Sequence, residues 1–274
     1  MRTLMSPPLL LLTLLCGCDA AGSLEGNPTP APPTEPEEVR LEASDGVGLA
    51  GTWQAAPGVE RGMGALLLHQ VSDPSAPQHD RHDFDALRLD LLEAGVSVLA
   101  FDFRSHGASD DATVPAINLA GDREQLPLDV RAGIDFLQRQ GHSVDPDAIS
   151  VVGLGLGAAL ALVAVHESYD DFAPDWGARS AVAISARADR AADLNSDGTP
   201  VPNMALHNCL LIAGADHASD AADAQLLYDE VRDTARLELI DGSDAHGADL
   251  LATQPRVGDL VVDWFTDTWT PEDS

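Results

Sequence analysis

The chain has 274 residues, with 45 acidic residues against 15 basic ones, and every basic residue is an arginine. The formal net charge of −30 excludes nucleic-acid binding through a basic surface, because that binding depends on neutralising phosphates. With 45% hydrophobic residues, the chain is not wholly disordered and can bury a sizeable core.

The first 18 residues have the pattern of a bacterial secretory signal peptide. The apolar run Leu9 to Leu15 spans only about 10 Å as a helix, which is too short to cross a membrane. The tetrad Leu15-Cys16-Gly17-Cys18 resembles a lipobox in which Cys18 is the lipidated residue. We therefore predict a signal peptide over residues 1–18 and an exported lipoprotein, anchored on the periplasmic or cell-surface face of a bacterial membrane. The alternative is an ordinary signal peptide that is cleaved near Ala20.

Residues 19–38 are rich in proline and acidic side chains and contain almost no large apolar residue. Such a segment is typical of a solvated, extended linker between an anchor and a domain. The remainder, residues 39–274, has the length of one domain. If Cys18 is acylated and Cys16 leaves with the signal peptide, Cys209 remains alone and no disulfide within the chain is expected. Cys209 begins an apolar stretch, which predicts an inert thiol in the core.

Strand and helix patterns alternate through this domain. An antiparallel hairpin is predicted where residues 39–43 and 47–53 flank an Asp-Gly turn. Short apolar runs predict buried strands at residues 65–68, 96–101, 149–152, 181–184, 210–213 and 237–240. Apolar residues at helical spacing predict helices at residues 84–93, 128–138, 156–166, 221–232 and 257–264. This order predicts an α/β fold, with a mostly parallel central sheet, helices on both faces and an antiparallel N-terminal hairpin.

Four loops that follow predicted strands contain recognisable motifs, at the sheet edge where ligands bind in such folds. They are His69-Gln70-Val71, Asp102 to Ser109 (DFRSHGAS), Gly153 to Gly157 (GLGLG) and Asp241 to Gly247 (DGSDAHG). In this order they resemble the α/β-hydrolase superfamily, particularly small bacterial serine hydrolases. DFRSHGASD is similar to that family's D-x-R-G-H-G-x-S loop, and His246 lies where the catalytic histidine is found. The resemblance covers residues 39–269 and implies an α/β-hydrolase fold related to carboxylester and acyl hydrolases.

The third loop departs from the family pattern. In the family this turn is G-x-S-x-G, where the serine is the nucleophile and the flanking glycines avoid collisions. Here Gly153 and Gly157 are present, but Gly155 occupies the nucleophile position. Glycine tolerates the strained backbone of the turn but carries no hydroxyl. Because acyl transfer needs an activated nucleophile, we predict a hydrolase fold without serine-hydrolase activity.

The resemblance also implies the remaining parts of the site. Asp216 would orient His246, with Asp220 as the alternative acid, and His246 would be the general base. The backbone N–H groups of Leu156 and of Gln70 or the residue after it would form an oxyanion hole. The expected partners are a small-molecule ligand or ester-like substrate and, through the N-terminal lipid, a membrane. No cofactor and no metal are expected.

Three alternatives remain open from the sequence. One is a non-catalytic surface module that binds a ligand or a protein in the former active-site cleft. A second is a hydrolase in which His246 activates water directly. The third is a dinucleotide-binding protein, because Gly153-x-Gly155-x-x-Ala158 matches the fingerprint G-x-G-x-x-G/A. Against the third, several predicted strands precede the motif, and no acidic residue directly follows the next strand.

The segment from Asp193 to Gly198 (DLNSDG) matches the first half of a calcium loop, with Asp193, Asn195 and Asp197 as its ligands. Met204 stands where the bidentate glutamate is expected, so a solvated turn is the favoured interpretation.

Overall fold

The computed structural model describes residues 35–71, 79–111, 125–169, 178–194, 206–230 and 235–268. The predicted signal peptide with Cys18, most of the predicted linker, and Asn195 and Asp197 of the calcium-like loop lie outside the described residues. Residues 32–274 form one compact unit. Its described helices include none that is long and apolar enough to cross a membrane.

Strands and helices alternate after an N-terminal strand pair. The strands are β1 (Glu37–Glu42), β2 (Gly48–Gln54), β3 (Gly62–Leu68), β4 (Ser97–Phe101), β5 (Val144–Leu154), β6 (Ala178–Ile184), β7 (Cys209–Gly214) and β8 (Ala235–Ile240). The helices are α1 (Asp85–Glu93), α2 (Leu126–Arg139), α3 (Leu156–Tyr169), α4 (Ala188–Leu194), α5 (Ala218–Glu230), α6 (Gly247–Thr253) and α7 (Pro255–Thr268), with a short 3-10 helix η1 (Arg81–Phe84) before α1. The sequence patterns predict neither α4 nor α6, because seven residues are too few to show a clear apolar period.

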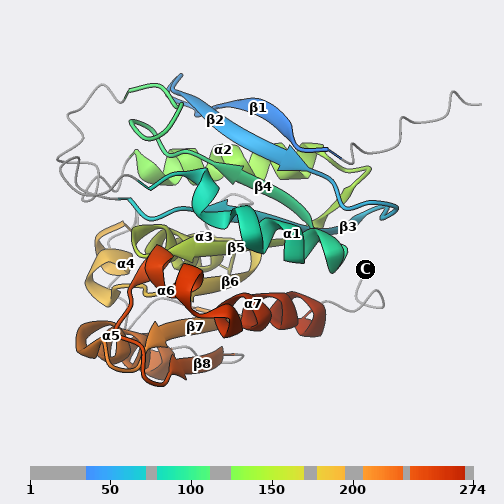
Figure 1. Ribbon diagram of the computed structural model, residues 1–274. Helices are drawn as coiled ribbons and strands as arrows, with labels where there is room; N and C mark the ends of the chain where they lie inside the picture. The colour runs from blue at the N-terminus through green and yellow to red at the C-terminus, as the bar shows by residue number, and fades with distance from the viewer. Residues whose placement is uncertain are drawn as a thin grey trace, which may run out of the picture. The chain divides into compact units, whose positions relative to one another are not determined.

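The strands form one eight-stranded sheet in the order β1-β2-β4-β3-β5-β6-β7-β8. β2 pairs antiparallel with β1 and with β4, and all other neighbours in the sheet are parallel. The predicted fold class is therefore confirmed. Since β3 and β5 are adjacent and parallel, the loops that follow them leave the same edge of the sheet side by side (Figure 1).

Helices cover both faces of the sheet, as its continuous apolar strands require (Figure 1). One apolar core joins the sheet to α2, α3, α4 and α5, and the other joins it to η1, α1, α6 and α7. Every α3 side chain from Leu156 to His166 is buried, which explains why this helix is apolar all round. Cys209 is also fully buried, and burial raises the pKa of its thiol to about 12, as expected for an inert core cysteine.

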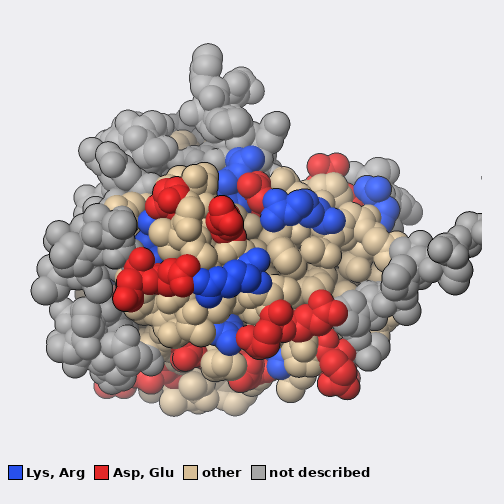
Figure 2. Space-filling model, turned by 90° about the horizontal axis from the view of Figure 1, so that it is seen from above, with Lys and Arg blue, Asp and Glu red and all other residues tan. Residues whose placement is uncertain are grey.

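Arginines on the surface lie beside acidic side chains, as the face seen in Figure 2 shows. Arg131 pairs with Asp135 at 2.8 Å, and Arg40 contacts Asp110. Such exposed pairs contribute little stability each, because water screens both charges.

A buried ion pair connects three segments of the fold. Arg104, in the loop after β4, is fully buried, and its guanidinium lies 2.6 Å from the carboxylate of Asp129 in α2 and 2.7 Å from that of Asp45 between β1 and β2. Asp129 also accepts the backbone N–H of Arg104 at 3.1 Å. Because a buried guanidinium is costly without partners, these contacts hold the loop after β4 against α2 and the N-terminal strand pair.

Asp129→Asn is expected to lower the free energy of unfolding by about 3 kcal/mol, because it removes a negative charge from the buried guanidinium of Arg104. The matched control is Asp135→Asn in the same helix, which disrupts the more exposed pair with Arg131 and should change the free energy by less than about 0.5 kcal/mol. Urea unfolding followed by circular dichroism measures both variants. Equal effects would contradict a structural role for the buried pair.

Candidate functional site

The turn between β5 and α3 has no room for a side chain at Gly153 and Gly157, and its middle residue Gly155 has a left-handed backbone. Gly155 has a positive φ of 55°, in the left-handed region that glycine adopts readily. A Cβ atom on Gly153 would overlap the carbonyl group of Gly157, and one on Gly157 would overlap the carbonyl oxygen of Leu68 at the end of β3. The predicted tight turn is therefore present, and it is held against the loop that follows β3.

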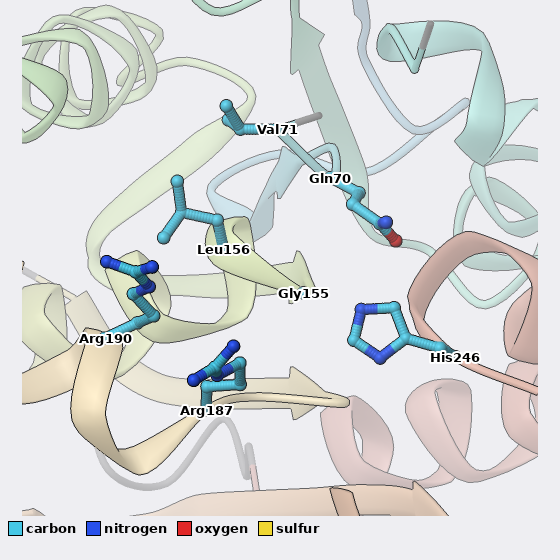
Figure 3. A pocket seen from close by; sticks show the side chains of 7 residues that line it. All are labelled: Gln70, Val71, Gly155, Leu156, Arg187, Arg190 and His246. Carbon is cyan, nitrogen blue, oxygen red and sulfur yellow. The ribbon is translucent and has the colours of Figure 1, made fainter. Parts of the chain in front are cut away.

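His246 faces Gly155 across the site (Figure 3). A Cβ atom built on Gly155 would lie 3.4 Å from His246 Nε2 and 3.1 Å from Gln70 Cγ. A side chain at position 155 would therefore start within reach of the imidazole, as a nucleophile beside its general base must.

The acid that contacts His246 is Asp220, and the expectation of Asp216 is corrected. His246 Nδ1 lies 2.6 Å from Asp220 Oδ2, and the Asp220 side chain is only 3% exposed. Asp216 is exposed in the turn after β7, where its backbone N–H donates to the carbonyl oxygen of Ser243. The physical reason is that α5 begins at Ala218, so its first turn brings Asp220 back towards His246.

Two residues that sequence reasoning did not identify also contact Asp220. His217 Nδ1 lies 3.0 Å from Asp220 Oδ1. The hydroxyl of Ser185, at the end of β6, hydrogen-bonds to Asp220 and accepts the backbone N–H of Gly247 at 3.0 Å. Burial alone would raise the pKa of Asp220, but these hydrogen bonds and the nearby histidine rings outweigh it and hold that pKa below its ordinary value. Asp220 is thereby kept as a carboxylate.

Gln70 contributes its side chain to the site. Its Oε1 accepts the backbone N–H of Ala248 at 3.3 Å, and a Cβ atom on Gly247 would overlap that oxygen. The side chain therefore passes between Gly155 and Gly247 towards His246 (Figure 3). The resemblance implied a role for the backbone N–H of Gln70 only.

His69 fixes the loop that carries Gln70. Its ring is fully buried, with Nδ1 2.9 Å from the carbonyl oxygen of Gln70 and Nε2 accepting the backbone N–H of Phe103 at 2.9 Å. Burial lowers the pKa of His69 to about 4, so the ring is neutral at pH 7. A neutral ring can satisfy one donor and one acceptor, which ties the loops after β3 and β4 together.

These elements enclose a pocket of about 200 Å³. Its lining residues are Gln70, Val71, Gly155, Leu156, Arg187, Arg190 and His246 (Figure 3). The structure thus brings together four of the predicted site residues and adds two arginines at the beginning of α4. Arg187 is exposed and pairs with Asp189 at 2.6 Å. Sequence reasoning placed neither arginine in the hydrolase-like site, because it did not predict α4.

Solved structures with similar architecture are hydrolases. A dienelactone hydrolase from Anabaena variabilis is 18% identical, with 86% of this chain and 98% of that chain covered and a TM-score of 0.63. An esterase from Pyrococcus furiosus is 22% identical, with coverages of 85% and 93% and a TM-score of 0.62. A serine hydrolase without a lid from Xanthomonas campestris is 21% identical, with coverages of 89% and 99% and a TM-score of 0.60.

The chain has the α/β-hydrolase fold. No protein-family model matches the sequence, and no curated protein matches it significantly. The α/β-hydrolase architecture places the turn around Gly155 after a central strand, with His246 on a loop before the last two helices.

The volume of the pocket argues against the alternative that the protein binds a dinucleotide. Pockets that hold drug-sized ligands range from about 300 to 1,000 Å³. A pocket of about 200 Å³ is therefore small for a dinucleotide. Two of the residues in that pattern already have a role in the turn: Gly153 through its close contact with Gly157, and Gly155 through its positive φ.

Gly153→Ala is expected to lower the free energy of unfolding by about 3 kcal/mol, because the added methyl group would meet the backbone of Gly157 and Ala158. Gly141→Ala is the matched control: its nearest non-neighbouring atom lies 3.9 Å from the added carbon, so a change below about 0.5 kcal/mol is expected. Chemical denaturation measures both variants. If Gly153→Ala is as stable as Gly141→Ala, the turn does not have the close contacts described above.

Proposed function

We propose that this protein binds a small molecule in the pocket beside Gly155 and does not act as a serine hydrolase. The observation that carries the proposal is the glycine at the nucleophile position. Gly155 keeps the left-handed backbone of the turn and faces His246 Nε2, but it supplies no hydroxyl for an acyl-enzyme. Loss of the nucleophile leaves an α/β-hydrolase site that retains its binding surfaces.

The pocket lining supports a ligand with hydrogen-bond acceptors, such as an ester, an acid or another acyl compound. Leu156 is the first residue of α3, and the first N–H groups of a helix have no partner within the helix. The lining contains two arginines, Arg187 and Arg190, although acidic residues outnumber basic ones threefold in the chain. These donors favour an oxygen-rich small molecule over a purely apolar one.

A second candidate function is hydrolysis by water that His246 activates. The His246–Asp220 contact of 2.6 Å favours it, because this pair holds the ring with Nε2 directed at the pocket. Such an enzyme would turn over without a covalent intermediate. Hydrolysis that is abolished by His246→Ala, in a protein that a fluorophosphonate does not label, would identify this activity.

The main proposal predicts that a fluorophosphonate probe does not label the wild-type protein, because the probe reacts with an activated serine. Gly155→Ser is expected to gain labelling and to raise esterase activity on p-nitrophenyl acetate at least about 100-fold, since a serine there starts 3.4 Å from His246 Nε2. Mass spectrometry of the labelled protein and a colorimetric assay measure the two effects.

Two further variants control this experiment. Adding His246→Ala to Gly155→Ser should remove the gained activity, because the serine loses its base. Adding Gln70→Ala should preserve or increase it, because Gln70 Cγ would lie only 3.1 Å from the new Cβ atom. Stoichiometric labelling of the wild-type protein would contradict the proposal.

We also propose that the protein is exported and anchored to a bacterial membrane through Cys18, as its lipobox-like tetrad indicates. In bacteria that express the full chain, labelled palmitate is expected to be incorporated into wild type and Cys16→Ala but not into Cys18→Ala. Equal incorporation into all three proteins would contradict lipidation at Cys18, and its absence from all three would contradict the anchor.

A further inference from the structure

Asp220 is contacted by two histidines, one on each carboxylate oxygen. His246 Nδ1 lies 2.6 Å from Oδ2, and His217 Nδ1 lies 3.0 Å from Oδ1. The two rings are 5.5 Å apart between centroids and are tilted by 34°. A general base and the acid that orients it require only one histidine. His217 is outside the pocket lining, so that pairing does not account for its position.

We propose that His217, Asp220 and His246 form a binding site for a divalent transition metal ion such as Zn²⁺. Each residue offers one ligand atom, and the three atoms lie within 4.8 Å of one another. Zn²⁺ sits about 2.0 to 2.2 Å from imidazole nitrogen and carboxylate oxygen, so ligand atoms at this spacing can share one ion after small side-chain movements. Two imidazoles and one carboxylate suit a borderline metal, whereas Ca²⁺ and Mg²⁺ prefer a full set of oxygens.

The local backbone positions these ligands. His217 directly precedes α5 and Asp220 lies three residues later in its first turn, so both side chains are on the same face of the helix. Ser185 also hydrogen-bonds to Asp220 and helps to orient the carboxylate. The two histidine side chains are each 33% exposed, which allows an ion to enter from solvent and to retain bound water.

The charges that surround the proposed ligands do not exclude a cation. Asp189 and Asp223 are close to the site: burial and the carboxylates of Asp189 and Asp220 raise the pKa of Asp223. Arg187 is a positive charge near Asp220, and its guanidinium is paired with Asp189 at 2.6 Å. Asp189 and Asp223 therefore offset the positive charges of Arg187 and Arg190, which line the adjoining pocket.

The proposed ion has a consequence for the pocket. Without metal, His246 Nδ1 donates its proton to Asp220, and Nε2 presents a lone pair to the region of Gly155. An ion on Nδ1 needs the lone pair of that nitrogen, so the single proton of the neutral ring moves to Nε2. The ion thereby converts His246 from a proton acceptor into a hydrogen-bond donor towards the pocket, with no change in the ring's own charge.

Titration of the full-length chain with zinc chloride in a calorimeter tests the site. One Zn²⁺ per chain is expected to bind and to raise the melting temperature, and EDTA should reverse both effects. His217→Ala is expected to weaken binding at least about 100-fold, because it removes one of three ligands. The control His142→Ala changes an exposed histidine outside the cluster and should bind Zn²⁺ like wild type. No binding by the wild type, or unchanged binding in His217→Ala, would overturn the proposal.

A second measurement follows the ring proton of His246 by ¹⁵N NMR of labelled histidine. The expected result is a proton on Nδ1 in the metal-free protein and on Nε2 after one equivalent of Zn²⁺. If Zn²⁺ binds while His246 keeps its proton on Nδ1, the ion occupies another site and the proposal fails. Neither measurement depends on ligand binding or hydrolysis in the pocket. The metal site and the proposed function are therefore tested independently of each other.

Discussion

The turn from β5 to α3 passes so close to the end of β3 that a side chain on Gly157 would overlap the backbone of Leu68. This steric contact sets where α3 begins, and therefore where Leu156 lies relative to the loop that carries Gln70. The second close contact, between Gly153 and Gly157, gives the turn its sharp reversal. Neither contact involves the residue at position 155. The geometry of the site is thus maintained by glycines that flank the nucleophile position, and a serine can be absent there without loss of the fold.

The long buried elements could be predicted from the sequence, while short or locally broken ones could not. Strands β6 and β7 are continuous apolar runs because both of their faces are covered. The beginning of β5 was not predictable in the same way, because Asp145 and Asp147 interrupt its apolar pattern near Val144. Helices α4 and α6 have seven residues each, so their apolar side chains show no period. With α4 missing from the prediction, Arg187 and Arg190 had no assigned place near the site.

The site residues also divide into those that could be predicted from the sequence and those that could not. The glycine turn and His246 could be found because each belongs to a motif whose order along the chain is characteristic. The acid was misassigned because Asp216 and Asp220 both follow β7, and spacing alone does not tell which one faces His246. That depends on where α5 begins: a start at Ala218, three residues before the predicted one, places Asp220 in the first turn. His217 was not linked to a metal because its proposed partner His246 is distant in sequence.

In this strongly acidic chain, single arginines pair with carboxylates at positions that matter for the fold and for the pocket. At Arg104, the fork of the guanidinium contacts Asp129 and Asp45 at once, which a lysine ammonium could not do with the same geometry. At the pocket, Arg187 belongs to the lining and also pairs with the carboxylate of Asp189. Across the whole chain, a charge of −30 opposes contact with an anionic lipid surface. The proposed lipid anchor would supply the attachment that the domain's charge disfavours.

His246 connects two environments through its two ring nitrogens. Nε2 faces the position where a serine would exchange its proton, and Nδ1 faces Asp220. With glycine at position 155, no side-chain hydroxyl there influences the ring, so the partner of Nδ1 alone decides which nitrogen carries the proton. Asp220 keeps that proton on Nδ1 and leaves Nε2 basic, as activation of water requires. A metal ion on Nδ1 would leave Nε2 as a donor, which suits binding of a carbonyl or carboxylate oxygen. The two candidate functions of the pocket therefore correspond to two different partners of one nitrogen.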